Sequence, residues 1–397
     1  MVPYRKDLTE KLLMFIMKHD ARDLISADAL EHTDWSTFLP FVRYHGLHSM
    51  LYPLLKPFRE HIPHVHYASF HKSYFQAIAF NVRAKGSFMK IKDLFDGNGI
   101  QLVPLKGMAL IFDIYSSHPS RPMCDLDILI TDSDYERAKD LLKQIGYIKN
   151  VSDDSEHYWR NEQMHVSFGP RDGTLPLCIL EMHWQLDYTR KYPLLSDLWH
   201  RVRTIPDEGD EIVTLSPEDT LFSLALHQRR FGAPLQLKYA FDTALLFKKY
   251  ENSIDIDYLI SEGRRSRIRS ALYALVKQCS FFYSDTSVER LLKELHISTL
   301  RKNCLDAMIK KNTFEIQNNT KQLFATLHLF LFDSWNEPLF YMLNIPYVQF
   351  CKYYGLLPGQ KYSRFLYSLR YFYYGIGLIQ LGVQKLCFLL RGEAEKR

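Results

Sequence analysis

Asp125 and Asp127 are the residues whose types and spacing first indicate chemistry. They flank one leucine at the start of an apolar run that ends at Ile130. Because side chains two apart in a strand project to the same face, this spacing brings the two carboxylates together. Burying them without a partner would be costly or would force one acid to take up a proton. The pair therefore predicts a Mg²⁺ site, and the alternative is a strand end with two solvated acids.

The same Asp-x-Asp spacing occurs at two other places in the chain. Asp132 and Asp134 stand where a helix is expected to begin, and Asp255 and Asp257 also precede a helical stretch. Acids at helix starts cap free N–H groups and interact favourably with the helix dipole. These two pairs are therefore predicted to be structural.

Glu181 offers a third acid within the apolar run 177–184. A buried strand would favour a hydrophobic residue there, and His183 falls on the same face as Glu181. Three carboxylates can hold two metal ions that clamp the attacking and the leaving oxygen of a displacement. We therefore predict that Glu181 joins Asp125 and Asp127, the alternative being an edge strand whose polar face meets solvent.

Lys106 and Gly107 stand at the predicted junction between a strand, 100–105, and a helix. Backbone N–H groups at such a helix start hold phosphate oxygens, and Lys106 would add positive charge. A Lys-Gly dipeptide also begins many ordinary helices, so it indicates a phosphate site only in combination with the acidic strand that follows. Arg121, four residues before Asp125, would either reach the same phosphates or cover the intervening loop.

The elements that must position these residues fall into three blocks. Residues 1–95 and 216–397 space their apolar residues three and four apart, which predicts helices, whereas 96–215 alternates short apolar runs with helices. Predicted strands in the middle block are 100–105, 124–130, 147–151, 157–161, 165–169 and 177–184, and predicted helices are 106–115 and 133–146. The pattern predicts an α+β fold whose mixed sheet core is flanked by N-terminal helices and a C-terminal helical domain.

The composition describes a globular chain of moderate charge. With 397 residues, 47% of them apolar and 24% charged, the chain can bury the cores of two or three domains. A net charge of +5 is weaker than that of a dedicated nucleic-acid binder, so no nucleic-acid partner is expected. The six cysteines lack zinc-type spacing, and the charged N-terminus is unlike a secretory signal, so we predict reduced thiols and a cytoplasmic location.

A long apolar segment near the C-terminus, 371–390, complicates that location. It is long enough to cross a bilayer, but Gln380, Gln384 and Lys385 give it one polar face. We predict a helix packed on the body of the protein. The alternative is an interfacial helix in peripheral contact with a membrane.

The order of these motifs resembles the uncharacterised bacterial nucleotidyltransferase family of the DNA polymerase beta superfamily. The shared order is Lys-Gly before a helix, an arginine, Asp-x-Asp before an apolar run, a helix ending in Gly-Tyr, and an acid followed by His-Trp. The helical segments 34–55 and 215–247 are also similar to the family. The likeness covers roughly residues 30–265.

The resemblance implies a minimal nucleotidyltransferase fold in which Asp125, Asp127 and Glu181 bind two Mg²⁺ ions and Gly107 opens the phosphate loop. It also implies transfer of a nucleotidyl group from a nucleoside triphosphate to a small-molecule, peptide or protein acceptor. Lys106 and the remaining candidates would position the donor.

Three further residues occupy positions similar to the family's polar residues after the core: His227, Lys238 and Asp242. Lys238 is expected to contact the donor together with His183. Alternatively, Lys238 forms a helix-surface ion pair with Asp242, four residues later. His227 is either a helix histidine with its own partner or a substrate contact.

The chain departs from the superfamily's usual Gly-Ser or Gly-Gly turn. Its turn, Lys106-Gly107-Met108, offers no hydroxyl to a phosphate. Two other functions therefore stay open: transfer of a glycosyl group from a nucleotide sugar to a phosphorylated peptide, and a non-catalytic nucleotidyltransferase-like binding scaffold. The sequence identifies neither the acceptor nor the base of the donor.

Overall fold

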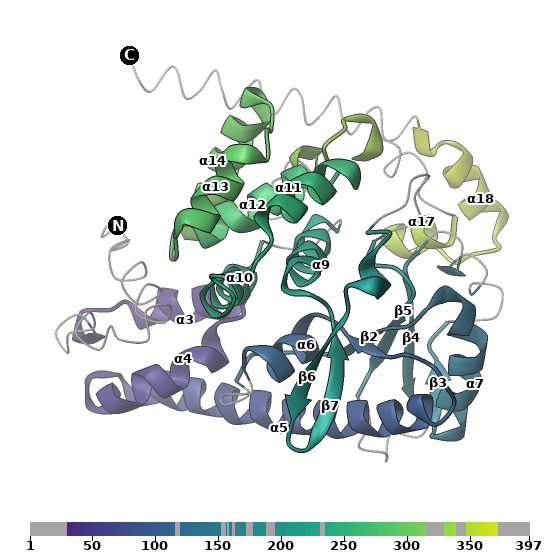
Figure 1. The fold of residues 1–397 in the computed structure, drawn as a ribbon, viewed down its shortest axis with the longest axis horizontal. Coiled ribbons are helices and arrows are strands. Elements are labelled where there is room, and N and C mark those ends of the chain that lie inside the picture. The colour runs from purple at the N-terminus through teal and green to yellow at the C-terminus, as the bar shows by residue number, and fades with distance from the viewer. Residues whose placement is uncertain are drawn as a thin grey trace. The chain divides into compact units, whose positions relative to one another are not determined.

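A computed structural model provides the structure. It describes residues 30–115, 120–151, 156, 159–160, 163–171, 178–187, 195–230, 235–314, 329–338 and 347–371. The chain divides into two compact units, Met1–Asn318 and Asn319–Arg397. The first unit contains the sheet and has the mixed α+β architecture that the sequence predicts (Figure 1).

Five short strands form the sheet, in the order β1-β2-β5-β4-β3. Their bounds are Val103–Pro104 for β1, Leu126–Leu129 for β2, Tyr147–Lys149 for β3, His165–Pro170 for β4 and Leu180–His183 for β5. β2 and β5 pair in parallel, and the other neighbouring strands are antiparallel. The sheet is therefore mixed, and β5 lies inside it with a strand on each side.

A hairpin outside this sheet was not predicted from the sequence. Its strands are β6 (Arg203–Asp207) and β7 (Asp210–Thr214). The two residues between them, Glu208 and Gly209, have φ values of 49° and 100°. Two consecutive left-handed residues are typical of the type I′ turn that joins tightly paired strands.

One predicted strand, 157–161, is wrong in the residues that the structure describes. Trp159 and Arg160 are helical. The Arg160 guanidinium lies 4.0 Å from the Tyr135 ring centroid and 4.3 Å from that of Trp184. Periodicity cannot distinguish a strand from a helix in a run of only five aromatic and polar residues. Tertiary contacts decide the conformation of such a run.

Helices make up most of the rest of the first unit. Before the sheet these are α3 (Trp35–Tyr44), α4 (His48–Leu55), η2 (Lys56–His61) and α5 (His64–Asp96). Between the strands they are α6 (Lys106–Asp113), η3 (Asp132–Asp134), α7 (Tyr135–Gln144) and η4 (Leu198–His200). After the hairpin they are α9 (Pro217–Arg229), α10 (Leu237–Lys249), α11 (Ile256–Arg265), α12 (Arg269–Cys279), α13 (Thr286–Glu294) and α14 (Thr299–Phe314).

The core of the first unit forms between α5 and the sheet. Phe88, Ile91 and Phe95 of α5 are buried at a spacing of three and four, so they lie along one stripe of the helix. They belong to the same apolar cluster as Ile128 of β2 and Met182 of β5. This packing fixes β2 and β5, the strands that carry the predicted acids.

Two helix starts have the predicted caps, whereas Asp134, which precedes α7, makes no side-chain capping bond. Ser216 caps α9 by accepting a hydrogen bond from the Asp219 N–H, with Pro217 as the first helical residue. Asp255 caps α11 by accepting from the Tyr258 N–H at 2.8 Å. These contacts give Asp255 a structural role, as expected from its position.

In the second unit, the described helices are α17 (Tyr347–Tyr354) and α18 (Lys361–Ser368). The predicted C-terminal helix falls mostly on 372–390, outside the described residues. Among the helices that the structure does describe, none is both long and apolar enough to span a bilayer. The division into domains 1–95, 96–215 and 216–397 stays a prediction.

Candidate active site

The parallel pairing of β2 with β5 brings two of the predicted acids together. Asp127 stands opposite Glu181 in the register, and Leu129 stands opposite His183. The His183 Nε2 atom lies 2.9 Å from Asp127 Oδ1 and 3.5 Å from Glu181 Oε2. Asp127 is only 5% exposed, which contradicts a pair of solvated acids, and β5 is not an edge strand.

Asp125 lies one residue before β2 and completes the acidic cluster, which we define as Asp125, Asp127 and Glu181. Burial, together with the negative charges of Asp127 and Glu181, raises the pKa of Asp125 to about 6. Asp125 is thus electrostatically coupled to the other two acids. The sequence predicts this cluster from the spacing of Asp125 and Asp127 and from the place of Glu181 within an apolar run.

Lys106 enters the acidic cluster from the start of α6. Its ammonium group forms an ion pair with Asp127 and lies 3.8 Å from Glu181 Oε2. Although burial raises the pKa of Asp127, Lys106 and a hydrogen bond from His183 together hold it well below its usual range. Lys106 thus stabilises the ionised form of a carboxylate that is almost fully buried.

The backbone at Lys106 is unusual for a residue with a side chain. Its φ is 49°, in the left-handed region that costs energy for residues other than glycine. The Leu105 N–H donates to the Asp127 carbonyl at 3.0 Å, so the chain leaves β1 beside the acidic strand and turns at once into α6. This turn delivers the Lys106 side chain to Asp127.

Gly107 is the second residue of α6, and its position is fixed by close packing. A Cβ atom there would lie 2.8 Å from the Nη1 atom of Arg121 and would overlap the side chain of Met123. Only glycine fits without moving these neighbours.

Arg121 forms a buried ion pair rather than facing the acidic cluster. Its Nε and Nη2 atoms donate to Asp242 of α10 at 2.9 and 2.7 Å, and the Tyr115 hydroxyl donates to the same carboxylate at 2.9 Å. Asp242 is fully buried. The predicted surface ion pair between Lys238 and Asp242 is therefore wrong, because Asp242 faces the protein interior and Arg121.

Lys238 and His227 come from the helices that follow the hairpin. Burial and the Arg121 charge together lower the pKa of Lys238 to about 8, while Asp242 and Asp125 act in the opposite direction. Burial and the charge of Lys106 lower the pKa of His227 well below its usual value. Among the described residues, no partner bonds the buried Nδ1 atom of His227. Both side chains therefore lie in the electrostatic environment of the acidic cluster.

His165 is a neighbour of the cluster that the sequence did not reveal. It pairs with His183 across β4 and β5, with ring centroids 4.8 Å apart. Its Nε2 atom lies 3.6 Å from Glu181 Oε1. Burial and the nearby His183 lower the pKa of His165 to about 3, so it stays neutral. Its only sequence signal was a polar residue opening the strand 165–169, which does not name its partner across the sheet.

The donor set of the acidic cluster suits a divalent cation. Three carboxylates and the ammonium group of Lys106 leave two net negative charges in a largely buried space. Carboxylate oxygens are the protein ligands that Mg²⁺ prefers. The residues present therefore fit the metal that the sequence predicts.

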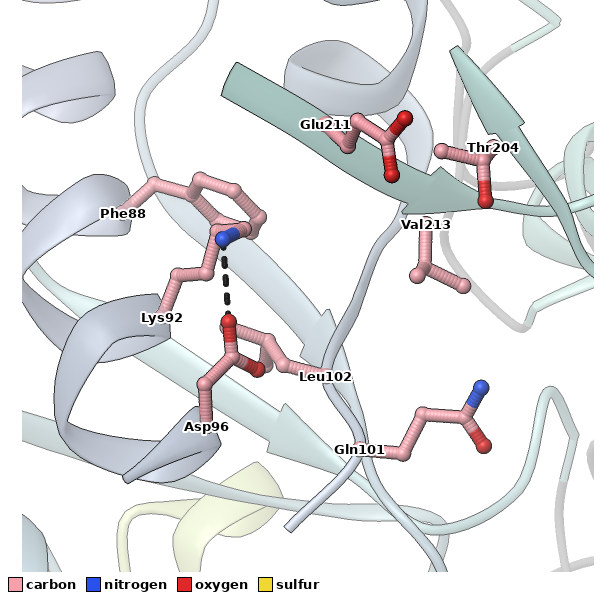
Figure 2. Close-up of a pocket in the computed structure, with 8 residues that line it drawn as sticks. All are labelled: Phe88, Lys92, Asp96, Gln101, Leu102, Thr204, Glu211 and Val213. Atoms are coloured by element: carbon pink, nitrogen blue, oxygen red, sulfur yellow. Dashed lines mark hydrogen bonds and ion pairs between the residues drawn. The ribbon is translucent and has the colours of Figure 1, made fainter. Parts of the chain in front are cut away.

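A separate cavity of about 240 Å³ lies between α5, the segment before β1 and the β6–β7 hairpin (Figure 2). Lys92 and Asp96 in its wall form an ion pair with each other at 2.9 Å. None of the predicted site residues lines this cavity. It is distinct from the acidic cluster.

Comparison with known proteins identifies the family. Residues 31–284 match the family model described as an uncharacterised nucleotidyltransferase, and this range contains every candidate residue named above. No curated protein and no solved structure gives a significant match. Since the family model spans well over half of the sequence, the chain belongs to this nucleotidyltransferase family.

Proposed function

We propose that this protein transfers a nucleotidyl group from a nucleoside triphosphate to a small-molecule, peptide or protein acceptor, with the fold of the DNA polymerase beta superfamily. The observation that carries the proposal is the meeting of Asp127 on β2 and Glu181 on β5, with Asp125 adjacent. Membership of the nucleotidyltransferase family supports the same class of reaction.

Mg²⁺ would be held by Asp125, Asp127 and Glu181, where it would neutralise phosphate charge and orient the leaving group. Glu181 is the more exposed of the two paired acids, with 22% of its side chain accessible against 6% for Asp127. It is thus suited to accept a proton from an acceptor hydroxyl. Asp127, held ionised by Lys106, is suited to bind cations only.

The donor phosphates would meet the start of α6 and the cation Lys238. The first N–H groups of α6, at Gly107 and beyond, supply hydrogen-bond donors and the positive end of a helix dipole. Lys238 has a lowered pKa because it is largely buried, so a phosphate beside it would meet a weakly solvated charge. His183 contacts Asp127 and Glu181, so it would act on the donor indirectly, by positioning these two carboxylates.

Arg121 and Lys106 support the site in different ways from those first expected. Arg121, predicted to reach phosphates or to cover the loop before β2, is better supported as a positioning residue, because its Nε and Nη2 atoms both donate to Asp242. Lys106 would contact a phosphate only by moving away from Asp127. Its main contribution is to balance the charge of the acidic cluster.

The scaffold alternative is favoured by one observation. Lys106 already places a cation between Asp127 and Glu181, and its turn lacks the hydroxyl of the Gly-Ser turn that is usual in the superfamily it resembles. In such a protein the lysine would replace the metal, and nucleotide binding would serve recognition. Glycosyl transfer from a nucleotide sugar would use the same acidic cluster and differs only in the bond that breaks.

Labelled donors distinguish these functions. The protein is incubated with each NTP, labelled at the α-phosphate or the base, or with sugar-labelled nucleotide sugars, together with Mg²⁺ and a cell extract. We expect an α-phosphate and base label to reach an acceptor, and Asp125→Asn/Asp127→Asn to lower the rate at least about 100-fold because the metal loses its ligands.

Asp257→Asn is the matched control, since Asp257 belongs to another Asp-x-Asp pair and lies at the surface beside Arg290. It should transfer as well as wild type. Equal nucleotide binding by wild type and the double variant, with no transfer by either, would favour the scaffold. Transfer of the sugar label alone would favour the glycosyl reaction.

The partners and location follow from charge and composition as proposals. With a net charge of +5, the protein is proposed to act in the cytoplasm on a nucleotide and a small or peptide acceptor rather than on nucleic acid. Peripheral membrane contact through 371–390 is the other proposal, and liposome sedimentation with and without residues 360–397 would test it.

A further inference from the structure

Two histidines, His165 and His183, face Glu181, one of the three carboxylates of the acidic cluster. The Nε2 atoms of His165 and His183 lie 3.6 and 3.5 Å from the two oxygens of Glu181. One ligand atom from each of these three residues can be chosen so that all three lie within 4.8 Å of one another. The three side chains come from adjacent strands, so a rigid sheet sets their spacing.

Hydrogen bonding accounts for only part of this arrangement, because the His183 Nε2 atom lies 2.9 Å from Asp127 Oδ1 whereas His165 has no such short contact with Glu181. At 3.6 Å, the contact between His165 and Glu181 is longer than a hydrogen bond. The buried Nδ1 atoms of His165 and His183 bond to no partner among the residues that the structure describes. Because these are not the nitrogens that contact Glu181, the inference rests on the two Nε2 atoms and the oxygens of Glu181.

The distances fit a metal ion that accepts nitrogen ligands. Atoms about 2.1 Å from a tetrahedral ion lie about 3.4 Å from each other, close to the two separations at Glu181. Imidazole nitrogen is a good ligand for Mn²⁺, Zn²⁺ and related ions, whereas Mg²⁺ prefers oxygen. The pair of histidines would therefore change which metal the site selects.

Lys106 places a positive charge on one side of the acidic cluster. Its ammonium group pairs with Asp127 and stays 3.8 Å from the Glu181 Oε2 atom. That charge weakens the attraction of Asp127 for a further cation, whereas the Oε1 atom of Glu181 faces the imidazole of His165.

We propose that His165, Glu181 and His183 form a binding site for one divalent transition-metal ion, which the site prefers to Mg²⁺. The inference rests on the proposed nucleotidyl transfer in that it names the metal class of the same site. The carboxylate ligand Glu181 would be shared with the acidic cluster, and the two imidazoles would supply the selectivity.

Metal binding is tested on the full chain after removal of metals with a chelator. Mn²⁺ binding is followed by electron paramagnetic resonance, with Mg²⁺ and Zn²⁺ as competitors. We expect one Mn²⁺ per chain, bound at least about tenfold more tightly than Mg²⁺, displacement by Zn²⁺, and nitrogen couplings in the Mn²⁺ echo spectrum. The nitrogen couplings need no variant, so they test the proposal even if a substitution impairs folding.

His165→Gln should weaken Mn²⁺ binding at least about tenfold while changing Mg²⁺ binding less than about twofold, because only the imidazole ligand is lost. His64→Gln, at the exposed start of α5, is the control and should bind both ions as wild type does. Wild-type affinity for Mn²⁺ in His165→Gln, or an Mn²⁺ spectrum without nitrogen couplings, would overturn the proposal.

The labelled-donor assay on the same preparations separates the two proposals. If Mn²⁺ binding depends on His165 but no donor yields transfer, the metal site stands and the proposed function fails. If nucleotidyl transfer proceeds and His165→Gln binds Mn²⁺ normally, the function stands and the metal site fails.

Discussion

At the scale of single residues, the acidic cluster depends on Lys106 for its charge balance. Lys106→Met leaves the buried carboxylate of Asp127 beside Glu181 without a cation. Breaking a buried ion pair in this way typically costs about 3–5 kcal/mol of unfolding free energy. We expect such a loss in urea unfolding of metal-free protein, and a smaller loss with saturating divalent metal, which restores the positive charge.

Lys92→Met is the matched control for that measurement. Lys92 pairs with Asp96 within α5, and half of the Asp96 side chain is exposed. A helix-surface pair of this kind contributes less than about 1 kcal/mol. Equal stability of Lys106→Met and wild type in the absence of metal would contradict the role assigned to Lys106.

The residues of the site differ in how far the sequence reveals them. Asp125, Asp127 and Glu181 could be predicted, because acids in apolar runs are costly unless something compensates them. His165 could not be, since its approach to His183 depends on strand register. The partner of Arg121 could not be either, because Asp242 lies 121 residues further along the chain.

At the scale of elements, the close contact between α6 and the loop before β2 gives a second prediction. Gly107→Ala places a methyl group against Met123 and the Arg121 guanidinium, which Asp242 holds in place. Overpacking of this kind costs about 1–3 kcal/mol, more than alanine gains from its helix propensity of about 1 kcal/mol. We therefore expect Gly107→Ala to lower both the melting temperature and the rate of transfer.

Gly86→Ala provides the comparison, because nothing lies within 4 Å of the added methyl group in α5. It should stabilise the protein by up to about 1 kcal/mol through helix propensity alone. If both alanine variants raised the melting temperature, the packing argument for Gly107 would be incorrect.

Elements were predictable where burial gave them a clear pattern. β2 and β5 lie inside runs that the sequence marks as apolar, because both faces of a central strand are covered. The β6–β7 hairpin was missed although Gly209 follows Glu208 between two alternating runs, a pattern that could have indicated the turn. The order of the strands in the sheet could not be predicted from the sequence, since pairing between distant segments leaves no local pattern.

At the scale of the whole molecule, His45 links the N-terminal helices to α10 and predicts a pH-dependent stability. Its Nδ1 accepts a hydrogen bond from the Leu237 N–H at 3.3 Å, which requires an unprotonated nitrogen. Burial lowers the pKa of His45 from 6.5 to about 3. The unfolded chain therefore binds a proton more readily, so this stability is complete above pH 6.5 and is lost as the pH falls toward 3.

Between pH 7.5 and pH 5.5, His45 alone should lower the free energy of unfolding by about 1.4 kcal/mol. Other buried histidines add to the loss in wild type, so the measurement compares wild type with His45→Asn, whose side-chain oxygen can still accept from Leu237. Urea unfolding at the two pH values should show a smaller pH effect in the variant by that amount. Identical pH effects in both proteins would rule out His45 as a source.

The parallel pairing of β2 and β5 also has a consequence for the protein during its synthesis. Asp127 and His183 are separated by 56 residues, and a parallel neighbour cannot be supplied by a tight turn. While β5 is still inside the ribosome, Asp127 of the nascent chain has neither Glu181 nor His183 beside it. If the acidic cluster binds a cation as proposed, binding would therefore follow translation of the whole sheet, and a product truncated before β5 would lack the complete site.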